Sequence, residues 1–289
     1  GTRLQGAGES RRDGAAGVVR AATDRLSESL RAIEEWTKAL PEAVEAGIPP
    51  RVESLRYRGY ELQRRLVASV EDRRRPQWRL CVLITEAACR GGDWLGVAAA
   101  AVSAGADCLQ LREPLLGGGD LLARGRRLRE ITGDAGAALV VNDRPDVALA
   151  CGADGVHLGQ ADLPVDAARR LAGERLVIGV STSRIEEARA ALAGGADLCG
   201  VGPMHSSGTK HKDRIVGPAY LAEFLAWGGL PHLAIGGIDA ERAGALAAAG
   251  ARGVAVCGAV AGAEDPAAAT RGILQAMDAG RAAAAELAP

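Results

Sequence analysis

The stretch "VVNDRPDVALACGADGVHLGQADLP", from Val140 to Pro164, contains two short apolar runs with an alanine-containing helical segment between them. Each run ends close to an aspartate, Asp143 in the first case and Asp162 in the second. Apolar strands that alternate with helices are typical of a parallel sheet buried on both faces. The stretch therefore predicts a strand–helix–strand unit with a carboxylate at matching points of two consecutive strands.

The same alternation continues over the chain from Arg79 onward. The apolar runs are, in order, RLCVLIT, CLQLRE, ALVVND, GVHLGQ, LVIGVST, LCGVGP, HLAIGG and GVAVCG. Helical stretches fill every gap, and one follows the last run. Eight such units predict an α/β fold, a closed (β/α)8 TIM barrel. An open doubly wound sheet is the alternative, but no GxGxxG motif follows the first run, as that fold would favour.

A four-residue repeat supports a barrel built from paired units. It reads AGAD at Ala104, CGAD at Cys151, GGAD at Gly194 and AGAR at Ala249. Each copy ends a helix and opens the second, fourth, sixth or eighth strand. The glycine fits the left-handed position that closes a helix.

The first part of the chain has a different pattern. Residues 1–17 are polar and rich in Gly and Arg, and we expect them to be disordered. Residues 18–76 predict a small all-α domain, because Leu26, Leu30, Ile33 and Trp36 recur at helical spacing. The segment "GIPP" separates its two helices. Residues 77–289 then form the barrel domain.

Composition limits the classes of partner. The formal net charge of the 289 residues is -1, so we expect no nucleic acid and no anionic membrane as a partner. No apolar run is long enough to span a bilayer, and no secretory leader is visible. The six cysteines form no CxxC pair, which favours buried free thiols in a reducing compartment. We therefore expect a cytoplasmic protein.

The ends of the predicted strands gather polar residues on one rim, where barrels of this kind place their active sites. Adjacent strands lie about 4.8 Å apart, so Asp143 and Asp162 could share one ion. Two carboxylates with room for water and phosphate are the usual way to hold Mg2+. The alternative is that each acid caps the helix that follows it. His157, also at a strand end, is more typical of a structural histidine.

Glycines follow the seventh and eighth strands at Gly236, Gly237 and Gly258. Such turns let backbone N–H groups approach a phosphate, although tight turns alone also explain them. The loop "SSGTK", which ends at Lys210, adds hydroxyls and a cation. A metal region and a glycine region together predict two phosphorylated substrates, one of which loses diphosphate with help from Mg2+.

These motifs resemble the thiamine phosphate synthase family from Arg79 to about Ala279. The resemblance rests on QLREP, the long stretch quoted above, IGVSTS, GVGPMHSSGTK, AIGGI and GVAVCGAV. It implies a Mg2+-dependent transferase of thiamine biosynthesis. Its substrates would be 4-amino-2-methyl-5-(diphosphooxymethyl)pyrimidine and a thiazole phosphate, and its products thiamine phosphate and diphosphate.

The resemblance also implies roles for individual residues. Asp143 and Asp162 would be the Mg2+ ligands. The expected catalytic residues are Arg112, Ser181 and Lys210. The pyrimidine diphosphate would contact Gln110, Arg112, Asn142, Ser181 and Lys210, and the thiazole phosphate would contact Ser207, Thr209, Gly237, Cys257 and Gly258.

Some features depart from the family pattern and leave alternatives open. Pro114 stands where the family has Lys, and Gly258 stands where Ser is common. A thiazole tautomerase-like barrel is one alternative, although IGVSTS lacks the histidine that this branch carries. A non-catalytic phosphate-binding barrel is the other. The N-terminal unit resembles, more faintly, a helical domain that precedes some bacterial synthases. Docking or dimerisation, and with it a homo-oligomer, is our hypothesis for that unit.

Overall fold

The computed structural model describes residues 14–70, 75–207 and 215–286. The chain divides into two compact units, Gly1–Arg74 and Arg75–Pro289.

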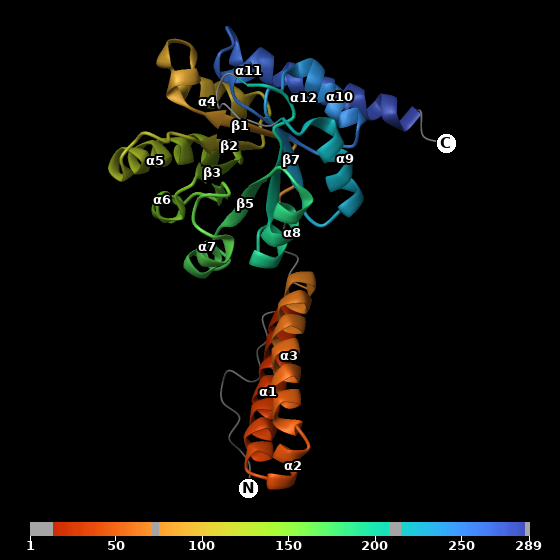
Figure 1. Cartoon of the computed structure of the whole chain (residues 1–289). Helices are drawn as coiled ribbons and strands as arrows, with labels where there is room; N and C mark the ends of the chain where they lie inside the picture. The colour runs from red at the N-terminus through yellow and green to blue at the C-terminus, as the bar shows by residue number, and fades with distance from the viewer. Residues whose placement is uncertain (1–13, 71–74, 208–214, 287–289) are drawn as a thin grey trace. The chain divides into compact units, whose positions relative to one another are not determined.

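The larger unit is a closed barrel of eight parallel strands in sequential order, ringed by helices (Figure 1). This confirms the predicted TIM barrel and excludes the open sheet. The register places Asn142 beside His157 and Ser181 beside Gly200. The strands are β1 Leu80–Ile84, β2 Cys108–Leu111, β3 Ala138–Asn142, β4 Gly155–Leu158, β5 Val177–Thr182, β6 Leu198–Val201, β7 His232–Ile235 and β8 Val254–Val256.

The helices of this unit cover the outside of the strands, and the layer between is buried and mostly aliphatic. A second, smaller cluster fills the barrel interior. The helical segments are η1 Glu86–Ala88, η2 Arg90–Gly92, α4 Trp94–Ser103, α5 Gly118–Ala135, α6 Pro145–Cys151, α7 Val165–Ala172, α8 Ile185–Gly194, α9 Gly217–Trp227, α10 Ala240–Ala248, α11 Gly258–Ala261 and α12 Pro266–Glu286.

The four-residue repeat closes the N-terminal end of the barrel. Asp107 accepts hydrogen bonds from the backbone N–H groups of Arg79 and Leu80, at 2.8 and 2.9 Å. Asp154 accepts one from Leu139 at 2.8 Å, and Asp197 accepts one from Ile178 at 2.9 Å. Each aspartate therefore ties the start of its own strand to the start of the preceding strand.

The fourth copy of the repeat carries arginine in place of aspartate. There the backbone N–H of Arg252 donates to Nε2 of His232 at 3.3 Å. His232 is buried at the start of β7 and packs edge-on against Phe224. Burial, followed by the nearby Arg252 charge, lowers the pKa of His232 to about 4.

All six cysteines are free thiols, as the sequence predicts, and five of them are buried. Burial raises the pKa of Cys199 to about 12, so this thiol stays protonated and acts as a small apolar group. Among the described helices, none is both long and apolar enough to cross a bilayer.

The smaller unit consists of α1 Gly14–Lys38, α2 Pro41–Glu45 and α3 Ile48–Val70. Helices α1 and α3 lie side by side and run in opposite directions (Figure 1). Helix α1 begins at Gly14, so residues 14–17, for which we expected disorder, are helical. Ala15 and Ala16 are strong helix formers and extend the helix in this direction. Residues 1–13 lie outside the described part of the chain.

Candidate active site

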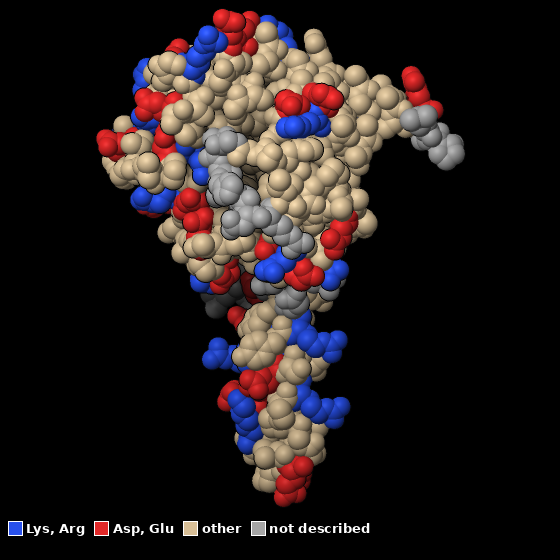
Figure 2. Space-filling view, turned by 45° about the horizontal axis from the view of Figure 1, so that its top comes forward, with Lys and Arg blue, Asp and Glu red and all other residues tan. Residues whose placement is uncertain are grey.

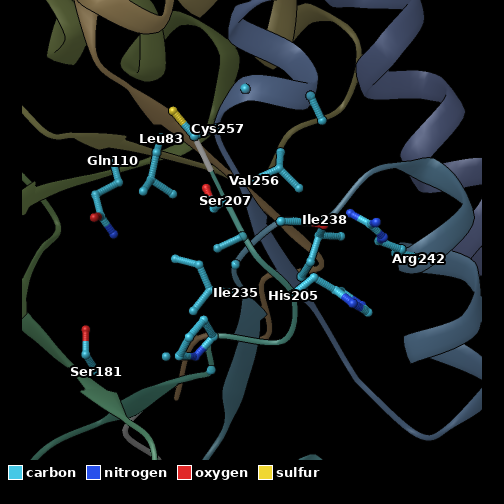
Figure 3. A pocket seen from close by; sticks show the side chains of 18 of the residues that line it. Leu83, Gln110, Ser181, His205, Ser207, Ile235, Ile238, Arg242, Val256 and Cys257 are labelled. Carbon is cyan, nitrogen blue, oxygen red and sulfur yellow. Dashed lines mark hydrogen bonds between the residues drawn. The ribbon is translucent and has the colours of Figure 1, made fainter. Parts of the chain in front are cut away.

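A cavity of about 600 Å³ opens at the C-terminal ends of the barrel strands. Figure 3 shows Gln110 and Ser181 on one side of it, and His205 and Arg242 on the other. The two sides come from different strands, β2 to β5 on one and β6 to β8 on the other. The cavity therefore has the size and the two-sided construction that a pair of small substrates requires.

The structure brings together eight of the residues singled out from the sequence. The cavity is lined in part by Gln110, Arg112, Asn142, Ser181, Ser207, Gly237, Cys257 and Gly258. Two further candidates, Thr209 and Lys210, fall outside the described residues. Asp143 and Asp162 are not among the lining residues.

Ser181 is fixed from two directions. Its hydroxyl oxygen lies 2.9 Å from Nε2 of His157, and its backbone carbonyl accepts a hydrogen bond from the Gln160 side chain at 2.7 Å. Glycines make room for the His157 ring inside the barrel. A Cβ atom at Gly179 would come within 2.7 Å of the ring, and one at Gly200 within 3.0 Å. His157 therefore contributes to the site by holding Ser181.

At the end of β2 the chain sends neighbouring side chains in different directions. Arg112 lines the cavity, and its carbonyl accepts a hydrogen bond from the Thr85 hydroxyl at 2.7 Å. Glu113 instead binds the Glu86 N–H at 2.6 Å and Arg124 at 2.9 Å. Pro114 lies exposed in the following turn and does not line the cavity. The missing family lysine thus falls at a position that faces solvent.

Asp143 follows β3 in an unusual backbone conformation. Its φ angle is 62°, which makes it the non-glycine residue with positive φ among those described. Its N–H donates to the His157 carbonyl at 2.8 Å, which holds it beside β4. A residue kept in this sparsely populated region often serves a function. The next residue, Arg144, pairs with Asp146 and lowers the pKa of that carboxyl.

Asp162 lies in the loop after β4, where Oδ2 accepts a hydrogen bond from the Gly159 N–H at 2.6 Å. Neither aspartate caps a helix, because the residues at the cap positions of α6 and α7 are Arg144 and Pro164. The helix-cap alternative is therefore wrong for both. Within the described ranges, no cluster of three or more His, Cys, Asp or Glu could enclose a metal. An ion held by these two acids would take its other ligands from substrate and water.

The glycine turns divide into two kinds. Gly236 and Gly237 have positive φ, and a Cβ at Gly237 would lie 2.1 Å from the Ser206 carbonyl oxygen. Close packing against the loop after β6 therefore accounts for both. Gly258 differs, because a Cβ there would meet nothing within 4 Å. The chain itself does not require a glycine at position 258, and the serine common in the family would fit.

Arg242 is a lining residue that our sequence reasoning missed. It lies in the first turn of α10, where Asp239 is the N-cap and accepts a hydrogen bond from the Arg242 N–H at 2.9 Å. One guanidinium nitrogen donates to the Gly237 carbonyl at 2.6 Å, which places the cation beside the glycine turn. The sequence signal that could have found Arg242 is the short spacing between the Gly236–Gly237 pair and Asp239, a residue type that caps helices.

The excess of positive charge is confined to the cavity lining. Acidic and basic side chains are interspersed over the visible face of the barrel (Figure 2). The described cavity lining nevertheless carries two arginines, Arg112 and Arg242, against one carboxylate, Asp239. Such a lining favours anionic ligands such as phosphates.

Comparison with known proteins decides the family. A family model described as thiamine monophosphate synthase matches residues 80–260. The thiamine-phosphate synthase of Moorella thermoacetica is 45% identical over 68% of this chain and 94% of its own length. The chain belongs to the thiamine monophosphate synthase family. It is a transferase of thiamine biosynthesis, as the motifs implied. Membership of this family favours the synthase over the tautomerase-like and non-catalytic alternatives.

The similarity to other thiamine phosphate synthases extends beyond the barrel. The enzyme of Gloeobacter violaceus is 38% identical over 97% of this chain and 80% of its own length. A second model, the ThiD2 family, matches residues 1–65. The solved thiamine phosphate pyrophosphorylase of Pyrococcus furiosus superposes with a TM-score of 0.65 at 31% identity, over 72% of this chain and 98% of that one.

Proposed function

We propose that the cavity joins 4-amino-2-methyl-5-(diphosphooxymethyl)pyrimidine to a thiazole phosphate. The observation that carries this proposal is the two-sided cavity. Arg112 lines one side and Arg242 the other, and residues of the quoted motifs complete the lining. The pyrimidine diphosphate would occupy the side formed by β2, β3 and β5. The thiazole phosphate would occupy the side formed by the loops after β6, β7 and β8.

On the pyrimidine side, the ring and its diphosphate would meet two amides, from Gln110 and Asn142, and the hydroxyl of Ser181. The bond between the pyrimidine methylene carbon and the diphosphate oxygen breaks, and its electron pair leaves with the diphosphate. Arg112 stabilises the charge on this leaving group, and we assign the same duty to Lys210. The thiazole nitrogen then gives its lone pair to the methylene carbon and forms the new C–N bond.

Asp143 and Asp162 are the residues that would hold Mg2+. Both carry hard anionic oxygens, both lie beside the end of β4, and neither is used as a helix cap. A bound Mg2+ would neutralise charge on the diphosphate and ease its departure. The hydrogen bond from Gly159 orients the Asp162 carboxylate, which limits the rearrangement that binding requires.

On the thiazole side, Arg242 adds a charged contact to the polar groups expected from the motifs. Its bond to the Gly237 carbonyl keeps the guanidinium at the glycine turn, where a phosphate would approach. Ser207, Thr209, Gly237 and the Cys257–Gly258 turn would supply hydroxyl and backbone donors. We also propose that the enzyme works in the cytoplasm on these small molecules, with its catalytic residues confined to the barrel domain, residues 77–289.

A coupling assay with the full chain tests the proposal. We expect thiamine phosphate and diphosphate in equal amounts when both substrates and Mg2+ are present. Omitting either substrate, or removing Mg2+ with a chelator, should stop both products. Isomerisation of a thiazole phosphate alone would indicate a tautomerase, and binding without turnover would indicate a non-catalytic barrel.

A further inference from the structure

The helical hairpin of the smaller unit has a polar seam. On α1, the described buried side chains are Thr23, Ser27 and Glu34, which recur at helical spacing. Glu34 pairs across the seam with Arg56 of α3 at 2.9 Å. Among the described side chains of this unit, Val52 is the buried aliphatic one. Leu30 adds a half-buried side chain beside Gly59. In its described part, the seam therefore supplies little of the apolar burial that stabilises packed helices.

The large apolar side chains of the hairpin lie on its surface instead. Leu26 and Ile33 are seven residues apart on α1, and Leu55 and Leu62 are seven apart on α3. Each of the four is between 46% and 49% exposed. Trp36, one turn beyond Ile33, is 71% exposed. A seven-residue apolar repeat is the pattern of a helix that packs along its length against other helices.

These side chains share one face of the hairpin. Leu26 and Ile33 directly precede the seam positions Ser27 and Glu34 on α1, and Leu55 directly precedes Arg56 on α3. In two antiparallel helices, positions that precede the seam fall on the same side of the pair. The opposite face carries Tyr57, which follows Arg56 and stacks under its guanidinium at 4.8 Å.

We propose that this apolar face binds the same face of a second copy of the chain, so that the two hairpins form a four-helix bundle. The dimensions fit a dimer. Helices of 25 and 23 residues are roughly 35 Å long. Two packed helices are roughly 20 Å across, so one face offers on the order of 700 Å², close to the roughly 800 Å² per partner of a stable interface.

A second hairpin is the occupant that matches this face best. It presents the same apolar rows with the same repeat and length, and a two-fold axis sets each row against its counterpart. In a bundle the apolar rows become the core that the polar seam does not provide. The polar seam, with its Glu34–Arg56 pair, then fixes how the two helices of one hairpin align.

The test uses the full chain and two exposed aromatic residues on different faces of its hairpin. We compare Trp36→Glu with the matched control Tyr57→Glu, whose side chain is 58% exposed. Sedimentation should show a dimer for the parent chain and for Tyr57→Glu. Trp36→Glu should raise the dimer dissociation constant by roughly a hundredfold or more, because a charge enters the apolar interface.

Circular dichroism separates dissociation from misfolding. A monomeric Trp36→Glu variant that keeps its helical signal, with dimer and helix both retained in Tyr57→Glu, supports the proposal. Equal effects of the two substitutions would overturn it. A monomeric parent chain would overturn it as well, and if Trp36 were then protected from labelling, another part of the same chain would be the occupant.

Discussion

The two ends of β4 each carry an aspartate that accepts a backbone N–H, yet the two carboxylates are placed for different work. Asp154, before the strand, binds the Leu139 N–H at 2.8 Å and pairs with Arg129 at 2.6 Å. Asp162, after the strand, binds the Gly159 N–H at 2.6 Å. The first carboxylate joins two strands and neutralises a cation, whereas the second is oriented by a backbone N–H of its own loop.

The position of an aspartate on the barrel therefore decides its role. At the N-terminal end, Asp107, Asp154 and Asp197 accept hydrogen bonds from backbone N–H groups of neighbouring strands. These bonds contribute to the free energy of folding. At the C-terminal end, Asp143 keeps a left-handed backbone and neither acid caps a helix. We propose that these charges serve the ligand, as active-site acids do in barrels of this kind.

The largest effect that this comparison predicts is on turnover at the C-terminal end. Asp143→Asn should lower turnover by roughly a thousandfold or more, because the amide supplies no charge to a metal. The thermal midpoint should stay within about 2 °C of the parent, since asparagine tolerates the left-handed backbone. Steady-state kinetics and calorimetry on the same preparation check both. Near-normal turnover would remove Asp143 from the metal site.

At the N-terminal end the predicted effect is on stability. Asp197 is buried, bonds the Ile178 N–H and forms a close ion pair with Arg169. Asp197→Ala should lower the free energy of unfolding by about 3 kcal/mol, because it leaves a cation and a donor without their carboxylate. Urea unfolding measures this loss. Turnover per folded molecule should match the parent, and a selective loss of turnover would contradict the division of roles.

Acid should weaken the same end of the barrel through His232. Because its folded pKa is about 4, below the ordinary 6.5, the folded state favours the neutral ring. The associated stability is complete above about pH 6.5 and is lost as the pH falls toward about 4, by up to about 3 kcal/mol. His232→Gln should flatten this part of the pH–stability curve. An unchanged slope would show that other groups cause the acid sensitivity.

A smaller effect is expected at the thiazole side of the cavity. Arg242→Ala should raise the KM for the thiazole phosphate about tenfold, the equivalent of one charge-assisted hydrogen bond, and leave the KM for the pyrimidine diphosphate unchanged. The matched control is Arg184→Ala, an exposed arginine paired with Glu187 away from the cavity lining. Equal effects on both KM values would place Arg242 outside the thiazole site.

Sequence alone predicted the barrel, the order of its strands and eight of the residues that line its cavity. This succeeded because parallel strands all end on one rim, so the residue after each apolar run is placed by topology. Arg242 escaped prediction because the direction of its side chain depends on where α10 begins, which Asp239 sets as the N-cap. The orientation of Pro114 also escaped, because adjacent residues in a turn point in different directions. For the helical unit, helix periodicity was readable. That the apolar rows of Leu26 and Leu55 lie on the surface was not, because the Glu34–Arg56 pair decides which side of each helix meets the other.

The most direct test of the comparison makes one substitution at each end of β4. Asn keeps a hydrogen-bond acceptor and removes the charge at both positions, so Asp154→Asn and Asp162→Asn form a matched pair. We expect Asp162→Asn to lower turnover by roughly a hundredfold with unfolding free energy unchanged. Asp154→Asn should keep full turnover and lose about 1 kcal/mol of stability, the value of a partly exposed ion pair. Equal turnover in the two variants would contradict the account.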